Sequence, residues 1–91
     1  MLEWDERTRR SNLRKHGIDF RRIVAAFKSE RRVVFEDDRK DYGEKRLIML
    51  CPVNDILLHV AFTIRGGAIR IISARRANRR EQRTYERHRH H

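Results

Sequence analysis

The sequence predicts an α+β fold with two N-terminal helices, a four-stranded antiparallel sheet and a C-terminal helix. A tight hairpin is indicated by Gly66-Gly67 between two β-rich segments, because such turns need positive φ angles that glycine adopts easily. The apolar residues after Asp19 recur with the spacing of a helix, which predicts the second helix. A capping box of Asn78 and Glu81 precedes the basic C-terminal segment, where it predicts the start of a helix.

Two helices are expected before the first strand. Asp5 is a suitable N-cap and Gly17 a suitable C-terminal residue, so the first helix should end at about Lys15. Asp19 should cap the second helix. The apolar residues of that helix follow the spacing i, i+3, i+4, i+7 and predict a core face, formed by Phe20, Ile23, Val24 and Phe27.

Four strands are expected, at Arg31–Phe35, Tyr42–Cys51, Ile56–Arg65 and from Ile69 onward. A two-residue loop at Gly66-Gly67 would place Val60 opposite Ser73. A four-residue loop of sequence PVND would place other pairs across the preceding hairpin, namely Cys51 opposite Ile56, Met49 opposite Leu58 and Leu47 opposite Val60.

These pairings give the predicted sheet two different faces. One face is apolar throughout and should be covered by the second helix; it comprises Leu47, Met49, Cys51, Ile56, Leu58, Val60, Phe62, Ile64, Ile69 and Ile71. The other face has an apolar patch that the C-terminal helix or a partner must cover, comprising Ile48, Leu50, Leu57 and Ile72.

The rest of that second face gathers chemically active groups. In the predicted register Thr63 lies opposite both Glu44 and Arg70, and Arg65 lies opposite Tyr42. Three arginines, a carboxylate, a phenol and a hydroxyl therefore converge, from Tyr42, Glu44, Arg46, Thr63, Arg65 and Arg70. A solvated face on which Glu44 merely balances charge is the plainer interpretation.

The chain is strongly basic, with a net charge of +10, a pI near 11.2, and arginine as 19 of its 23 basic residues. Arginine binds phosphate bidentately and stacks on bases, so a polyanion or an acidic protein is the expected partner. The charge is uneven, since residues 75–91 hold seven Arg and two Glu while residues 36–44 hold five acids.

The C-terminal arginines predict a basic helix that captures RNA electrostatically, or alternatively a passive solvated helix. The residues concerned are Arg75, Arg76, Arg79, Arg80 and Arg83.

Several function classes are disfavoured. The single cysteine and the lack of an apolar run or signal-peptide pattern favour a cytoplasmic protein with no membrane role. We expect no metal or other cofactor, because His16 and His59 are isolated, and His59 is interpreted as a packing residue. Residues 1–91 should form one domain, with residues 88–91 as a tail or tag remnant.

Three segments resemble the BrnT family of toxins from type II toxin–antitoxin pairs: WDERTRRSNLRKHGIDF, DYGEKR and RIISARRANRREQRTYE. The family often has Asp-Pro where this chain has residues 28–32. The resemblance implies a fold similar to the RelE and ParE toxins and ribonuclease activity that arrests growth. It also implies a BrnA-like antitoxin that neutralises the toxin and represses the operon through its own DNA-binding domain, so that DNA is contacted only through the antitoxin.

RNA cleavage needs no metal when the 2′-hydroxyl attacks the adjacent phosphate. Arg46, Arg65 and Arg70 would stabilise the transition state, with Glu44 as general base or ion-pair partner and Tyr42 as proton donor.

The match at the KHG segment makes Lys15 and His16 candidates for RNA contact, although both also suit a helix C-terminus. The alternatives to a ribonuclease are a non-catalytic nucleic-acid-binding module and a protein-interaction module.

Overall fold

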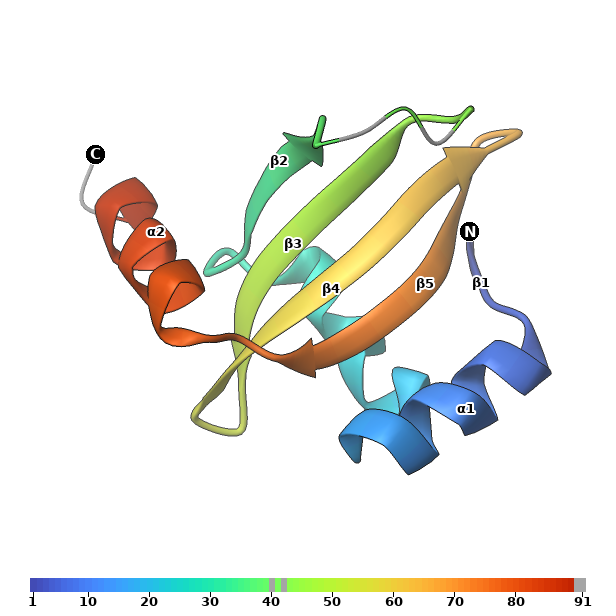
Figure 1. The fold of residues 1–91 in the computed structure, drawn as a ribbon, viewed down its shortest axis with the longest axis horizontal. Coiled ribbons are helices and arrows are strands. Elements are labelled where there is room, and N and C mark those ends of the chain that lie inside the picture. The colour runs from blue at the N-terminus through green and yellow to red at the C-terminus, as the bar shows by residue number, and fades with distance from the viewer. Residues whose placement is uncertain (40, 42, 90–91) are drawn as a thin grey trace.

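The computed structural model describes residues 1–39, 41 and 43–89, which form a five-stranded sheet flanked by three helices (Figure 1). The strands are β1 (Leu2–Glu3), β2 (Val33–Asp37), β3 (Arg46–Val53), β4 (Ile56–Arg65) and β5 (Ala68–Arg76). They lie in the order β1-β5-β4-β3-β2. The helices are α1 (Glu6–His16), the 3₁₀ helix η1 (Phe20–Lys28) and α2 (Arg79–Arg89).

The predicted four-stranded antiparallel sheet is wrong, because β1 adds a fifth strand parallel to β5. Leu2 lies opposite Ile69 and Glu3 opposite Arg70, and the Ile69 amide donates to the Met1 carbonyl over 2.8 Å. Two residues are too few to show the period-two alternation by which a strand is recognised in a sequence.

The second predicted N-terminal helix is a 3₁₀ helix, η1, rather than an α-helix. Asp19 caps it as expected and accepts from the Arg21 amide. Phe20, Ile23 and Ala26 are buried, which is the three-residue repeat of a 3₁₀ helix. Val24, expected in the core, is 43% exposed because it falls between these positions.

Helix α1 begins after the Asp5 cap and ends at Gly17, whose φ of 73° is left-handed, so both predicted boundaries are confirmed. Its anchor on the sheet is polar. The buried Asn12 amide donates to the Ala74 carbonyl over 2.8 Å and accepts from the Ala74 amide over 3.0 Å. It also donates to the Ile18 carbonyl, so one side chain fixes α1 to β5 and to the turn before η1.

The turn between β3 and β4 is a two-residue turn at Asn54 and Asp55, whose φ angles of 50° and 66° are those of a type I′ turn. The predicted four-residue PVND loop is therefore wrong, and Met49 lies opposite Val60 instead of Leu58. Since the register moves by two residues, every side chain keeps its predicted face.

The two-residue turn at Gly66-Gly67 is confirmed, but a bulge interrupts the β4–β5 pairing further along. Ile72 is the extra residue, so Ser73 lies opposite Ala61 and Ala74 lies opposite Val60. The predicted pairing of Val60 with Ser73 is wrong for this reason.

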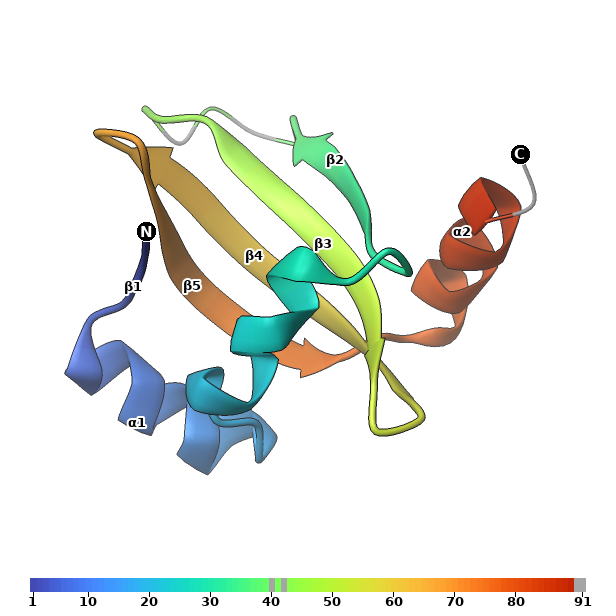
Figure 2. The ribbon, with the colours of Figure 1, turned by 180° about the vertical axis from the view of Figure 1, so that it is seen from behind.

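The sheet has an inner face, packed against η1 (Figure 2), and an outer face, partly covered by α2. The predicted apolar set lines the inner face, except that Ile64 is 56% exposed. On the outer face Ala77 and Tyr85 cover the apolar patch, which confirms α2 as a cover. The Tyr85 hydroxyl donates to the Arg31 carbonyl over 2.7 Å and so ties α2 to the start of β2.

Candidate functional site

A row of polar residues crosses the outer face from one edge of the sheet to the other. Each member lies directly opposite the next, in the order Glu3, Arg70, Thr63, Arg46 and Asp37. The predicted pairing of Thr63 with Glu44 is wrong, since the two-residue shift brings Arg46 there. Arg65 follows Thr63 by two residues on β4 and therefore shares its face. The structure thus brings the three predicted arginines onto neighbouring positions of one face.

Arg65 and Arg70 lie beside carboxylates. The Arg65 guanidinium lies 3.0 Å from the Glu44 carboxylate, and that of Arg70 lies 3.7 Å from Glu3. The Arg65 and Glu44 side chains are partly exposed, so water screens their attraction. The cluster is therefore an ion-paired surface from which RNA would have to displace carboxylates. Tyr42, the predicted proton donor, lies outside the described residues.

Thr63 is buried at the centre of the row, with 1% of its surface exposed. Its hydroxyl donates to the Lys45 carbonyl over 2.6 Å. This bond fixes the segment that leads from Glu44 into β3, so the hydroxyl has a structural partner.

Beside the row on the outer face, β2, β4 and α2 surround a hollow of about 380 Å³, which Asp37 of the row also lines. Arg75 forms a bidentate pair with Glu81 at 2.8 Å for both bonds, and the His59 Nε2 atom lies 3.5 Å from the same carboxylate. The pKa of His59 is lowered by burial and by the Arg75 charge, against the opposing effect of Glu81. The lowered pKa favours the neutral form of His59, whose buried side chain lies beside the charged Glu81 and Arg75 as well as beside the apolar Ile48.

The predicted capping box of α2 is confirmed, because the Glu81 amide donates to Asn78 and the Asn78 amide donates to Glu81. The basic helix is shorter than predicted, since Arg75 and Arg76 belong to β5. The pleat of β5 sends those two side chains to opposite faces. The remaining predicted arginines are exposed on α2, at Arg79, Arg80 and Arg83.

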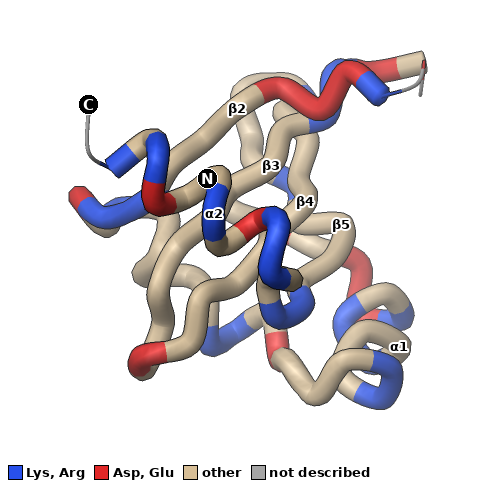
Figure 3. The backbone as a smooth tube through the Cα atoms, turned by 60° about the vertical axis from the view of Figure 1, so that its left-hand side comes forward, with Lys and Arg blue, Asp and Glu red and all other residues tan. Residues whose placement is uncertain are grey.

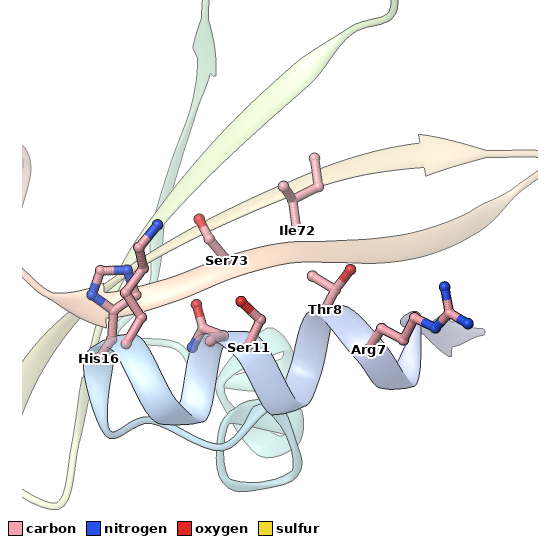
Figure 4. Close-up of a pocket in the computed structure, with 8 residues that line it drawn as sticks. Arg7, Thr8, Ser11, His16, Ile72 and Ser73 are labelled. Carbon is pink, nitrogen blue, oxygen red and sulfur yellow. The ribbon is translucent and has the colours of Figure 1, made fainter.

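A second hollow of about 380 Å³ lies between α1 and the bulge of β5 (Figure 4). We call it the α1–β5 groove; it is lined by Arg7, Thr8, Ser11, Asn12, Lys15, His16, Ile72 and Ser73. Figure 4 shows Thr8 and Ser11 on the side of α1 that faces β5, with Arg7 at one end and His16 at the other. Both RNA-contact candidates of the KHG segment, Lys15 and His16, therefore lie in one groove.

Basic residues are concentrated on the two α-helices, whereas acidic residues gather at the end of β2 (Figure 3). Among the described residues, no group of three His, Cys, Asp or Glu side chains could hold a metal ion. In the same part of the chain, every helix is too short or too polar to cross a membrane.

An α+β domain with arginines across one sheet face and along two helices has the surface of a nucleic-acid-binding protein. The chain belongs to the BrnT family: residues 4–81 match the family described as ribonuclease toxin, BrnT, of type II toxin-antitoxin system. It is therefore a ribonuclease toxin, and a cognate antitoxin is its partner. No curated protein sequence matches the chain.

The sequence interpretation missed most of the groove and the polar surroundings of His59. Arg7, Ser11 and Lys15 recur at intervals of four residues and so form a polar stripe on α1, which could have been recognised. Ser73 could not have been recognised as a groove residue, because its direction depends on the bulge in β5.

Proposed function

We propose that the toxin cleaves RNA on the outer face of its sheet, at the row formed by Arg70, Thr63 and Arg46 with the neighbouring Arg65. The observation that carries this proposal is the placement of three arginines on neighbouring positions of one sheet face. A pentacoordinate phosphate has more negative charge than the phosphodiester from which it forms. Arginines fixed in advance around it therefore stabilise the transition state more than the substrate.

The proposed reaction is metal-independent and endonucleolytic. The 2′-oxygen bonds to the adjacent phosphorus as its proton passes to the Glu44 carboxylate, and the bond from phosphorus to the 5′-oxygen breaks. The leaving oxygen takes a proton from a donor, for which Tyr42 is the candidate. The products are a 2′,3′-cyclic phosphate and a 5′-hydroxyl end.

Glu44 can take this role only if Arg65 releases it when RNA binds. The two side chains are partly exposed, and the Arg65 guanidinium donates to the Glu44 carboxylate over 3.0 Å, so the phosphate can replace the carboxylate at the guanidinium. In the toxin without RNA, Arg65 and Glu44 would neutralise each other. When RNA binds to Arg65, Glu44 would be released to act as the base.

The exposed arginines of α2 extend the basic surface beside this site. Arg79, Arg80 and Arg83 would hold flanking phosphates and contribute affinity with little sequence preference. Arg75, being paired with Glu81, and Arg76, at the end of β5, would contribute less. Lys15 and His16 complete the proposed RNA-binding set, whereas Thr63, predicted from the sequence as an RNA contact, would support the row from within because it is buried and bonded to the Lys45 carbonyl.

We further propose that a BrnA-like antitoxin covers the outer face, including its basic row and the edge of the apolar patch. One surface would then serve both substrate and inhibitor, which explains neutralisation by simple competition. DNA would be contacted only through the antitoxin, and the toxin would act in the cytoplasm as a single domain.

The test compares purified parent protein with the double variant Arg65→Gln/Arg70→Gln on single-stranded RNA. We expect the rate of cleavage at saturating RNA to fall by about 100-fold or more, because removing one such donor commonly costs this much. Parent products should carry cyclic phosphate ends. Induction in a bacterial host should arrest growth for the parent and not for the double variant.

The matched control is Arg10→Gln/Arg14→Gln, which removes the same charge from exposed positions of α1 outside both hollows. It should cleave within about twofold of the parent, as expected for substitutions away from the site. Undiminished cleavage by the Arg65/Arg70 variant would place the chemistry elsewhere. Salt-sensitive RNA binding without product, from the parent itself, would favour a non-catalytic module.

A further inference from the structure

The α1–β5 groove contains basic residues that have no ion-pair partner. Among the described residues, the side chains of Arg7, Lys15 and His16 have neither an ion pair nor a hydrogen bond. Neither Asp nor Glu lines the groove. An unneutralised cation cluster beside a hollow is a ready binding site for an anion.

The groove also offers neutral hydrogen-bond donors. The hydroxyls of Thr8, Ser11 and Ser73 line it, and no described group accepts from or donates to them. Asn12 contributes only to the wall, since its amide is bonded to Ala74 and Ile18. Donors surrounding a hollow that has no competing acceptor side chain match the oxygens of a phosphate group.

The shape of the groove suits a chain of phosphates better than a single one. Arg7 and Lys15 are eight residues apart on α1, so their Cα atoms are separated by roughly 12 Å along the helix axis. Hydroxyls occupy the interval between these two cationic ends (Figure 4). The cations can therefore contact different phosphates of one strand, with the hydroxyls in between.

We propose that the α1–β5 groove binds the phosphate backbone of single-stranded RNA, as a second contact region that leads the strand to the outer face. Ile72 and Ser73 form the bulge at the rim of the groove, and Arg70 lies two residues before Ile72 on the same strand. Ile72 also packs with Ile48 and Ala61 on the outer face. A strand that leaves the groove across this rim therefore meets Arg70 next.

This inference rests on the proposed function, in that the strand so held is the substrate. It adds that the contacts in the groove determine affinity, whereas the outer row determines the rate of cleavage. Because the contacts in the groove would be made to phosphates, the affinity that they contribute should not depend on base sequence.

The test measures binding of a short, fluorescently labelled 2′-O-methyl RNA, which lacks the attacking hydroxyl and stays intact. The double variant Arg7→Gln/Lys15→Gln should bind it about tenfold more weakly than the parent at moderate salt. The slope of log affinity against log salt should decrease by about 1.4, since each single-strand phosphate contact contributes about 0.7. On ordinary RNA the variant should show a raised KM and an unchanged kcat.

Arg10→Gln/Arg14→Gln is again the control, because it changes the charge of the same helix by the same amount outside the groove. It should retain the parent affinity. Equal affinities and salt slopes for the parent and Arg7→Gln/Lys15→Gln would overturn the inference. Loss of antitoxin binding with intact RNA binding would also overturn it, in favour of an acidic protein segment in the groove.

The two proposals fail in different ways. A parent that leaves ordinary RNA uncut, but binds 2′-O-methyl RNA through the groove, would refute the catalytic proposal and support the groove. If the parent cuts RNA and Arg7→Gln/Lys15→Gln binds 2′-O-methyl RNA normally, the groove proposal is refuted and the catalytic proposal stands.

Discussion

The outer-face row and the α1–β5 groove are both rich in cations, yet only the first contains acids. Arg65 and Arg70 have carboxylate neighbours at 3.0 Å and 3.7 Å, whereas Arg7 and Lys15 have none among the described residues. The row lies on the sheet itself, and the groove lies where a helix meets the sheet edge.

Secondary structure explains the difference. Neighbouring strands are about 4.8 Å apart, so a long side chain on one strand reaches the residues on the next. On a helix the available neighbours are three or four residues away, and Lys15 has only Ser11 and Asn12 at those positions within α1. Arg65 and Arg70 of the sheet are thus neutralised and Arg7 of α1 is left available, although Arg9 of the same helix, three residues after Glu6, is paired with it and with Asp19.

The largest expected effect concerns the wall of the groove. Asn12→Ala removes the three hydrogen bonds that hold α1 to Ala74 and Ile18, leaving buried backbone groups unsatisfied. The free energy of unfolding should fall by about 3 kcal/mol, measured by urea denaturation. Ser11→Ala, one residue earlier and exposed, should change it by less than about 0.5 kcal/mol. Equal costs would mean that α1 is held by other contacts.

A smaller effect is expected at the centre of the row. Thr63→Val keeps the shape of the side chain but removes the bond to the Lys45 carbonyl. We expect about 1 kcal/mol less stability in urea. RNA affinity of the folded variant should stay close to that of the parent, because the hydroxyl is buried. Unchanged stability together with weaker RNA binding would instead make Thr63 an RNA contact.

Asp19, which caps η1 and pairs with Arg9 of α1, should make the stability of the protein depend on pH in the acidic range. The pKa of Asp19 is lowered to about 2, chiefly by the Arg21 side chain and backbone amide, with a contribution from Arg9 on α1. The folded protein therefore resists protonation that the unfolded chain accepts, so stability present above pH 4 is lost as pH falls toward 2. Asp19→Asn should reduce the proton uptake on unfolding by up to about one proton, measured by urea denaturation at several pH values. An unchanged pH slope would contradict this.

The smallest effect is expected near neutral pH, at the hollow beside the row. Burial and Arg75 lower the pKa of His59, so the unfolded chain binds a proton that the folded protein does not. The stability contributed by neutral His59 is present above about pH 6.5 and is lost as pH falls below it. His59→Gln should flatten this part of the pH profile in thermal unfolding. A steeper loss in the variant would show that His59 is protonated in the folded state.

Local signals in the sequence predicted the features that depend on neighbouring residues. Asp5, Gly17 and the Asn78–Glu81 capping box are confirmed as helix boundaries, because caps are formed within a few residues of the chain. The assignment of side chains to the two sheet faces also survived the wrong β3–β4 loop. The error was two residues, and the side chains of a strand alternate with a period of two.

Long-range features could not be predicted in this way. Leu2 and Glu3 form a strand only because β5 is beside them, and Ala26 replaces Val24 in the core only because η1 has three residues per turn. The ion pairs of the row depend on register, so the sequence placed the three arginines on one face but put Glu44 instead of Arg46 opposite Thr63. The groove depends on a helix and a bulge that are about sixty residues apart in the sequence.

The single extra residue at Ile72 determines which way the rest of the chain points. If the same residues paired without a bulge, strict alternation would turn Arg75 inward and Ala74 outward, so the guanidinium that binds Glu81 would be directed at the hydrophobic core. Deleting Ile72 itself should leave Ser73, Ala74 and Arg75 opposite the same residues of β4, whereas inserting one residue between Ile72 and Arg75 should turn Arg75 inward and be far more damaging. The length of this strand is constrained more tightly than its composition.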